Sequence, residues 1–152
     1  MISTPPRVYF DANVFITALE QSSARSDHAW WILQAIQDGE IAGVTSEITL
    51  AEVLVKPIEL GMQDLVVAYE SMIAPASNFD VPAVTREILI DAARVRSRRA
   101  SVKLPDAVHL ATARSRSCVF FVTEDRRMEV LEGMKRLVVS PFTLDEILRA
   151  AE

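Results

Sequence analysis

Residues 7–16, RVYFDANVFI, pass from an apolar stretch to a carboxylate and then into a helical pattern. Val8, Tyr9 and Phe10 are β-branched or aromatic, which is typical of a buried strand, and Asp11 follows them directly. A carboxylate beside a buried strand is costly to dehydrate unless a partner compensates its charge. The segment therefore predicts a strand that ends at an acidic site and leads into a helix.

Apolar runs of the same kind recur along the chain and predict a mainly parallel sheet that is covered on both faces. The expected strands are 8–10, 41–45, 118–123, 136–140 and the less apolar 78–81. Helical periodicity fills the gaps, and it predicts further helices over 28–39, 47–55, 62–73, 84–99, 106–116 and 143–151. This alternation indicates an α/β fold, and without a repeat or linker we expect one domain over residues 1–152.

Composition and charge exclude several classes of protein. The chain is 50% hydrophobic, and its single cysteine, Cys118, allows no disulfide within the chain, which fits a reducing compartment. Apolar runs stay well below the roughly 18 residues of a membrane span, and the start MISTPPRVYFD lacks signal-peptide regions, so we expect a cytoplasmic protein. The net charge of −5 disfavours a general phosphate-binding surface, so contact with nucleic acid must be local or assisted by metal.

Four acidic residues are expected near one end of the sheet. Asp11 and Asp125 each follow a predicted strand, and ligands of open parallel sheets bind outside the carboxyl ends of the strands. Asp106 is expected near a helix start, because Pro105 suits a first turn and disfavours helical geometry at the residue before it. Glu52 lies on the helix after the second strand.

Each of these acids also has a purely structural interpretation. Asp11, Asp106 and Asp125 would each stabilise a helix N-terminus, and Thr49-x-x-Glu52 matches a capping box. Taken singly, these interpretations are at least as favourable as a chemical role. They are weaker when taken together, because all four acids fall near one predicted end of the sheet.

Electrostatics indicates what such a cluster would need. Two carboxylates about 4 Å apart repel each other by about 4 kcal/mol at an effective dielectric constant near 20. Four of them require shared protons or a cation, and ligands that are all oxygen favour Mg²⁺ or Mn²⁺. These ions polarise phosphoryl oxygens and activate water, and such an ion would hold Asp11 ionised.

At this point the sequence resembles the PIN domain family and, within it, the VapC-like toxins. The resemblance spans nearly the whole chain and rests on four segments in the family's order: YFDANVFI, VTSEITLAEVLVKP, KLPDAVHLATA and FVTED. It implies a single α/β domain, an Mg²⁺- or Mn²⁺-dependent ribonuclease and, frequently, a cognate antitoxin. The residues that match the family's catalytic, metal-binding acidic quartet are Asp11, Glu52, Asp106 and Asp125.

Three further residues match or depart from the positions that support this quartet. Asn13 and Thr123 match the family's supporting polar positions. Glu124 departs from the pattern, because the family usually has Asn there. An additional acid at this place would alter the number or affinity of metals, or would point to solvent.

A basic segment, ARVRSRRASVK, precedes Asp106 and has two interpretations of equal standing. It would bind RNA phosphates beside the metals, or it would be a solvated helix end whose cations are favoured by the helix dipole. Its basic residues are Arg94, Arg96, Arg98, Arg99 and Lys103.

Four other residues attract attention without a clear chemical pattern. His109 follows Asp106 by three residues on the same helix face, although a lone histidine is more often a packing or surface residue. Cys118 is expected to be a buried apolar side chain. Trp30 and Trp31 cannot share one helix face, so we expect one in the core and the other at an interface. The apolar composition and the helix over 62–74 predict a homodimer.

The leading hypothesis is a metal-dependent endoribonuclease that acts as a toxin. One rival is a metal-dependent phosphohydrolase, against which Asn13 counts, because an aspartyl-phosphate enzyme usually has a second Asp at this place. Another rival is a module that binds RNA or protein without cleaving it.

Overall fold

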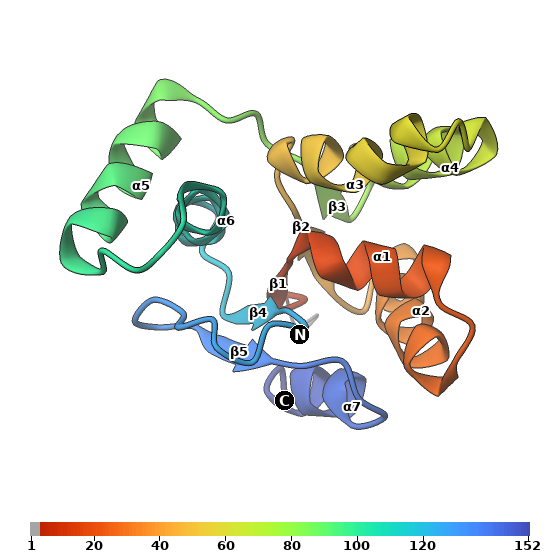
Figure 1. Cartoon of the computed structure of the whole chain (residues 1–152). Coiled ribbons are helices and arrows are strands. Elements are labelled where there is room, and N and C mark those ends of the chain that lie inside the picture. The colour runs from red at the N-terminus through yellow and green to blue at the C-terminus, as the bar shows by residue number, and fades with distance from the viewer. Residues whose placement is uncertain (1–3) are drawn as a thin grey trace.

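Five parallel strands form the central sheet of the computed structural model, which describes residues 4–152 (Figure 1). The strands are β1 (Arg7–Phe10), β2 (Ala42–Val44), β3 (Phe79–Asp80), β4 (Phe120–Val122) and β5 (Lys135–Leu137). Their order across the sheet is β3-β2-β1-β4-β5. The expected mainly parallel sheet is confirmed, and the last strand is shorter than 136–140, because Val138 and Val139 bond to groups outside the sheet.

Seven helices are found among the described residues, each close to an expected segment. They are α1 (Ala12–Glu20), α2 (Ala24–Gln37), α3 (Ile48–Glu59), α4 (Gln63–Met72), α5 (Arg86–Arg98), α6 (Leu104–Ser115) and α7 (Thr143–Arg149). The start of α2 lies four residues before the expected start at 28, because the Ser23 hydroxyl accepts a hydrogen bond from the Ser26 amide and caps the helix there.

Two local predictions are wrong. Leu104 was expected outside the helix because it precedes Pro105, yet α6 begins at Leu104, with the proline in its first turn, where no intrahelical N–H bond is required. Thr49 was expected to start a capping box, yet it lies inside α3 and its hydroxyl is 2.7 Å from that of Thr45.

The helices cover the sheet in two layers. The side chains of β1 point alternately to one layer and to the other. Tyr9 points to the face that packs against α5 and α6. Val8 and Phe10 point to the opposite face, which packs against α1, α2 and α7. Figure 1 shows α5 and α6 on one side of the strands and α1 and α2 on the other. Because both faces of β1 are buried, its sequence is continuously apolar.

The position of the candidate site follows from the order of the strands. The chain runs outward from β1 to β3 on one side, and it then returns to β4 on the other side of β1. Phe10 pairs with Val122, so the residues after these two strands, Asp11 and Thr123, leave the sheet side by side. This point, where the strand order reverses, is where open α/β sheets bind ligands.

Several other sequence expectations are tested by burial. Cys118 is buried, as expected. Neither tryptophan is in the core, because 41% of Trp30 and 53% of Trp31 is exposed, so the expectation of one core tryptophan is wrong. No helix within residues 4–152 has both the length and the apolar character needed to cross a membrane.

Candidate functional site

Asp11 has both a structural role and a place in the acidic cluster. It is the N-cap of α1, where its Oδ1 accepts a hydrogen bond of 2.8 Å from the Ala12 amide. Its Oδ2 accepts one of 2.8 Å from the Thr123 hydroxyl. The side chain is almost fully buried, so these donors replace the water that the carboxylate has lost. The capping interpretation is therefore correct for Asp11, and it does not exclude a second role.

Asn13, in the first turn of α1, contacts both the Asp11 carboxylate and the loop after β4. Its Nδ2 lies 3.2 Å from the Thr123 hydroxyl and 3.4 Å from Oδ2 of Asp11. Its Oδ1 accepts a hydrogen bond of 3.0 Å from the Glu124 amide. The Thr123 hydroxyl accepts a further bond of 3.0 Å from the Asp125 amide. Asn13 and Thr123 thus orient the segment that carries the last acid.

His109 contacts two of the acids, although the sequence favoured a packing or surface role for it. Its side chain is fully buried on α6, and Nε2 lies 2.5 Å from Oε1 of Glu52 and 3.5 Å from Oδ1 of Asp11. Nδ1 lies 2.5 Å from the Tyr9 hydroxyl. A carboxylate only accepts, so Nε2 donates to Glu52. The one signal in the sequence was the spacing of three residues from Asp106.

The acids also act on this histidine electrostatically. Burial alone would lower the pKa of His109. The hydrogen bond to Glu52 and the charge of Asp11 outweigh burial, so the pKa of His109 is raised. His109 is therefore an internal partner for negative charge.

Asp106 is the acid whose negative charge is least compensated by hydrogen-bond donors of the protein. It is half-buried in the first turn of α6, and among residues 4–152 it makes no hydrogen bond or ion pair. Burial and the charge of Asp11 raise the pKa of the Asp106 carboxyl, while His109 acts in the opposite direction. Glu52 and Asp125 raise this pKa further. The other three acids therefore all lie within electrostatic range of Asp106.

Asp125 and Glu124 follow β4 but differ in what they contact. The Asp125 carboxylate is partly exposed and accepts a bond of 2.9 Å from the Arg127 amide, so it closes a turn and does not start a helix. The Glu124 carboxylate accepts from the Val139 amide at 3.1 Å and lies 3.4 Å from the Arg25 guanidinium. The Glu124 carboxylate is therefore bound by two groups of the protein and does not point freely into solvent.

The residues fit a hard divalent cation by charge and donor type. Asp106 is a partly dehydrated carboxylate without a hydrogen-bond partner, and three other carboxylates act on its charge. Carboxylate oxygens are the ligands that Mg²⁺ and Mn²⁺ prefer. Among the described residues, however, no three His, Cys, Asp or Glu side chains already stand where they could hold one ion. Glu52 and Asp11 are instead bonded to donors of the protein.

The basic segment before Asp106 is only partly available to a ligand. Arg99 is half-buried and donates to the Glu129 carbonyl at 2.8 Å, and Arg96 donates to the Val102 carbonyl at 3.0 Å. Arg94 and Arg98 are exposed on α5, one helical turn apart, and make no side-chain bond to any other described residue. Lys103 is exposed at the N-cap of α6.

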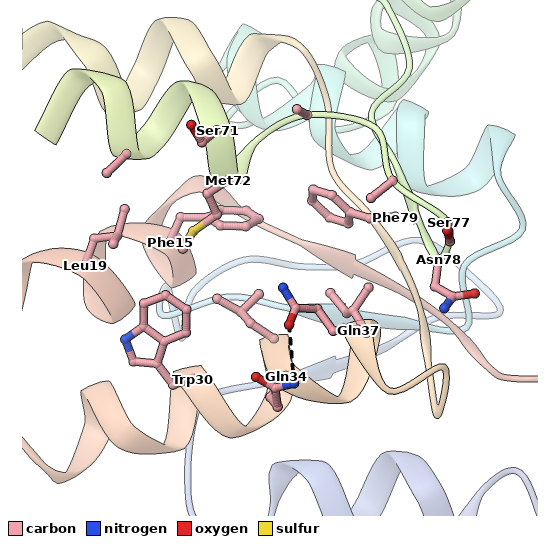
Figure 2. Close-up of a pocket in the computed structure, with 15 residues that line it drawn as sticks. Phe15, Leu19, Trp30, Gln34, Gln37, Ser71, Met72, Ser77, Asn78 and Phe79 are labelled. Carbon is pink, nitrogen blue, oxygen red and sulfur yellow. Dashed lines mark hydrogen bonds between the residues drawn. The ribbon is translucent and has the colours of Figure 1, made fainter. Parts of the chain in front are cut away.

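An apolar cavity of about 600 Å³ lies away from the acids (Figure 2). Figure 2 shows Trp30 and Gln34 from α2 facing Phe15 of α1 and Met72 of α4 across it. Trp30 is fixed at its edge by a hydrogen bond of 2.8 Å from Nε1 to the Ala18 carbonyl. This cavity explains the partial exposure of Trp30, because the space beside its ring is not filled by the chain.

Comparison with known proteins agrees with this geometry. The family model of the PIN domain matches residues 8–134. The chain is similar to a toxin–antitoxin complex from Klebsiella pneumoniae, with 23% identity, a TM-score of 0.61, and 88% of this chain and 97% of that chain covered. No curated protein matches the sequence.

Two further solved structures share the fold. VapBC2 from Rickettsia felis, solved with a promoter DNA fragment, has 11% identity and a TM-score of 0.68 over 88% of this chain and 99% of that chain. VapC20 from Mycobacterium tuberculosis, described as a sarcin-ricin loop cleaving toxin, has 18% identity and a TM-score of 0.57 over 75% and 86%. At these identities the likeness concerns the fold alone.

The different compensation of Asp11 and Asp106 predicts opposite effects on stability. In EDTA at neutral pH, Asp106→Asn should raise the thermal midpoint, because it removes one of several like charges in a half-buried place. Asp11→Asn should lower the midpoint by several degrees, because losing charge-assisted hydrogen bonds costs about 1–3 kcal/mol. Differential scanning calorimetry checks both, with the exposed Glu132→Gln as a control. A fall for Asp106→Asn equal to that for Asp11→Asn would contradict this electrostatic account.

Proposed function

This chain belongs to the PIN domain family, and on that premise we propose that it is an endoribonuclease that hydrolyses RNA phosphodiester bonds with Mg²⁺ or Mn²⁺. The observation that carries this proposal is Asp106. A half-buried carboxylate without a partner, whose pKa is raised by burial and then by Asp11, is unfavourable for a protein that never binds a cation there.

The proposed roles follow from the contacts of each acid. Asp11, Glu52, Asp106 and Asp125 would hold the ion, which when bound polarises a phosphoryl oxygen and activates water. Thr123 and Asn13 bond to Oδ2 of Asp11, so they fix the orientation of its carboxylate. His109 lies within 3.5 Å of both Glu52 and Asp11, so it would hold the Glu52 carboxylate near that of Asp11.

Two alternatives remain distinct from this proposal. A non-catalytic binding module would keep the acids for stability or partner binding, and the lack of compensation at Asp106 weighs against that use. A phosphohydrolase would act on small phosphate esters instead of RNA. Assays on total RNA, tRNA and a chromogenic phosphomonoester separate the three functions.

Cleavage of RNA provides the direct test. With Mg²⁺ or Mn²⁺ the protein should cut RNA internally, and EDTA should abolish this activity. Asp106→Asn should reduce the rate at least about a hundredfold, because a neutral amide is a poorer ligand for a hard cation. The exposed Glu132→Gln should cleave like the wild type. Wild-type cleavage by Asp106→Asn would leave Asp106 as a residue of the helix start only.

For an acidic protein to bind RNA, a local group of cations must offset the net charge. We propose the segment 94–103 for this role. Within it, the arginines whose side chains are exposed and unbonded are the ones available to RNA. Arg94 and Arg98 are exposed and have no side-chain bond to other described residues, whereas Arg96 and Arg99 are engaged with backbone carbonyls. Lys103 adds a charge next to the Asp106 helix.

Arg94→Ala with Arg98→Ala should therefore weaken RNA binding and flatten its dependence on salt, because fewer counterions are released. The log–log salt slope should decrease by up to about two, while the affinity for Mn²⁺ stays unchanged. Fluorescence anisotropy over a salt series measures both quantities for RNA. Arg149→Ala, at the end of α7, is the control for charge. An unchanged salt slope in the double variant would leave these arginines as a solvated helix end.

We also propose that the protein is the toxin of a toxin–antitoxin pair. Three of the similar structures are described as toxin–antitoxin or VapBC complexes. The apolar cavity beside Trp30 suits an apolar segment of such a partner, and Gln34 and Gln37 at its edge offer polar groups to a backbone. A small reading frame that overlaps the start of this gene, with a DNA-binding start and an amphipathic tail, would identify the antitoxin. Its absence would remove this part of the proposal.

A homodimer is the second proposed assembly. The helix α4 uses Val66 and Tyr69 inside the monomer, which weakens the expectation that residues 62–74 form the interface on their own. Exposed apolar side chains continue instead from the end of α3 into α4. They are Val55, Ile58, Leu60, Met62 and Val67.

Light scattering at micromolar concentration should therefore report a dimer. Ile58→Lys with Leu60→Lys should convert it to a monomer, because charges would be buried on that surface, and the thermal midpoint of the monomeric fold should change little. Phe142→Lys is the control, because Phe142 is equally apolar and exposed but lies at the start of α7. A wild-type monomer, or dissociation by the control alone, would refute this interface.

A further inference from the structure

Glu124 lies in the sequence between Thr123 and Asp125, yet its carboxylate is bound by Val139 and Arg25 and makes no bond to the other residues of the site. Its side chain is only 14% exposed. Burial of a carboxylate is costly without partners, and Glu124 has two. Oε1 accepts a hydrogen bond of 3.1 Å from the Val139 amide, and Oε2 lies 3.4 Å from the Arg25 guanidinium. The side chain thus joins the loop after β4 to the chain after β5 and to the first turn of α2.

The backbone of the same residue contacts the site. The Glu124 amide donates to Oδ1 of Asn13 at 3.0 Å. This bond orients the Asn13 amide, so that its Nδ2 faces Asp11. The two residues next to Glu124 are also bonded at the site. The Thr123 hydroxyl donates to Asp11, and it accepts from the Asp125 amide. Any shift of Glu124 would therefore move two polar groups around Asp11 and also the last acid.

We propose that Glu124 is a positioning residue for the metal site and not a ligand of it. Its carboxylate attaches the segment 123–125 to Val139 and Arg25. Through that attachment it fixes the position of the Asp125 carboxylate. The inference rests on the proposed function, because the site that it positions is the proposed metal site.

The attachment depends on the reach of the side chain more than on its charge. The Val139 amide is buried, so without an acceptor it would be left unpaired. A glutamine keeps the same length and offers an amide oxygen to Val139. An aspartate keeps the charge but is one methylene shorter. These differences separate a positioning residue from a ligand, for which the negative charge itself is required.

Binding of Mn²⁺, measured by titration with electron paramagnetic resonance, tests the proposal without any assay of activity. Glu124→Ala should weaken the affinity for Mn²⁺ by about 10–100-fold, which is typical when a partner behind a ligand is removed. Glu124→Gln should stay near the wild-type affinity. The exposed Glu132→Ala matches the change in net charge and should also bind like the wild type.

Amide hydrogen exchange gives a second measurement on the same proteins. In Glu124→Ala the amides of Val139 and Asp125 should exchange faster, while those at the centre of β1 stay protected. If Glu124→Ala does not fold, Glu124→Asp replaces it, since the shorter side chain should lose the bond to Val139 and weaken Mn²⁺ binding to a similar extent.

Each outcome separates the inference from the proposed function. A folded Glu124→Ala or Glu124→Asp with the wild-type affinity for Mn²⁺ would overturn the positioning role. An equal loss in Glu124→Gln and Glu124→Ala would make Glu124 a ligand and would also overturn it. A wild-type protein that binds no Mn²⁺ would instead overturn the proposed function, and the inference with it.

Discussion

The parallel register of β1 and β4 is the constraint on which the candidate site depends. Phe10 pairs with Val122, and the Asp11 amide donates to the Val122 carbonyl at 3.0 Å. The segments that follow β1 and β4 therefore leave the sheet at the same level, and Asp11 lies at hydrogen-bond distance from the Thr123 hydroxyl. A slip of one residue would turn Asp11 toward the other face and separate the two loops. Because β1 is apolar on both faces, its pairing with β2 on one side and β4 on the other holds this register.

The protein compensates its acids unequally. Asp11 is bonded to donors from α1 and from the loop after β4, and Glu52 is bonded to His109. Asp106 has no such donor among the described residues, and burial and nearby acids raise its pKa. Complete compensation would stabilise the fold and would leave no charge for a cation. Functional sites commonly retain such locally unfavourable groups, whose cost the rest of the fold offsets.

Much of the fold could be predicted from the sequence, because strands and helices leave periodic apolar patterns that local physics creates. The apolar runs around Tyr9 and Phe121 predicted buried parallel strands, and both residues lie in the core. The placement of Asp11 and Asp125 after strand ends predicted their common edge, since parallel strands share one. Helix starts were less certain, because a cap such as Ser23 is a local polar contact that apolar periodicity does not register.

What the sequence determined by itself was therefore the α/β class, the order of its strands and helices, and the acids that would meet at one edge. Only the tertiary structure decided which partners those acids have. His109 bonds to Glu52 across a separation of 57 residues, and Glu124 accepts a hydrogen bond from the Val139 amide across 15 residues. The physical reason is that hydrogen bonds and charge pairs depend on distances of a few ångströms between segments far apart in the chain. No periodicity within one segment encodes those distances, so they exist only once the elements have packed.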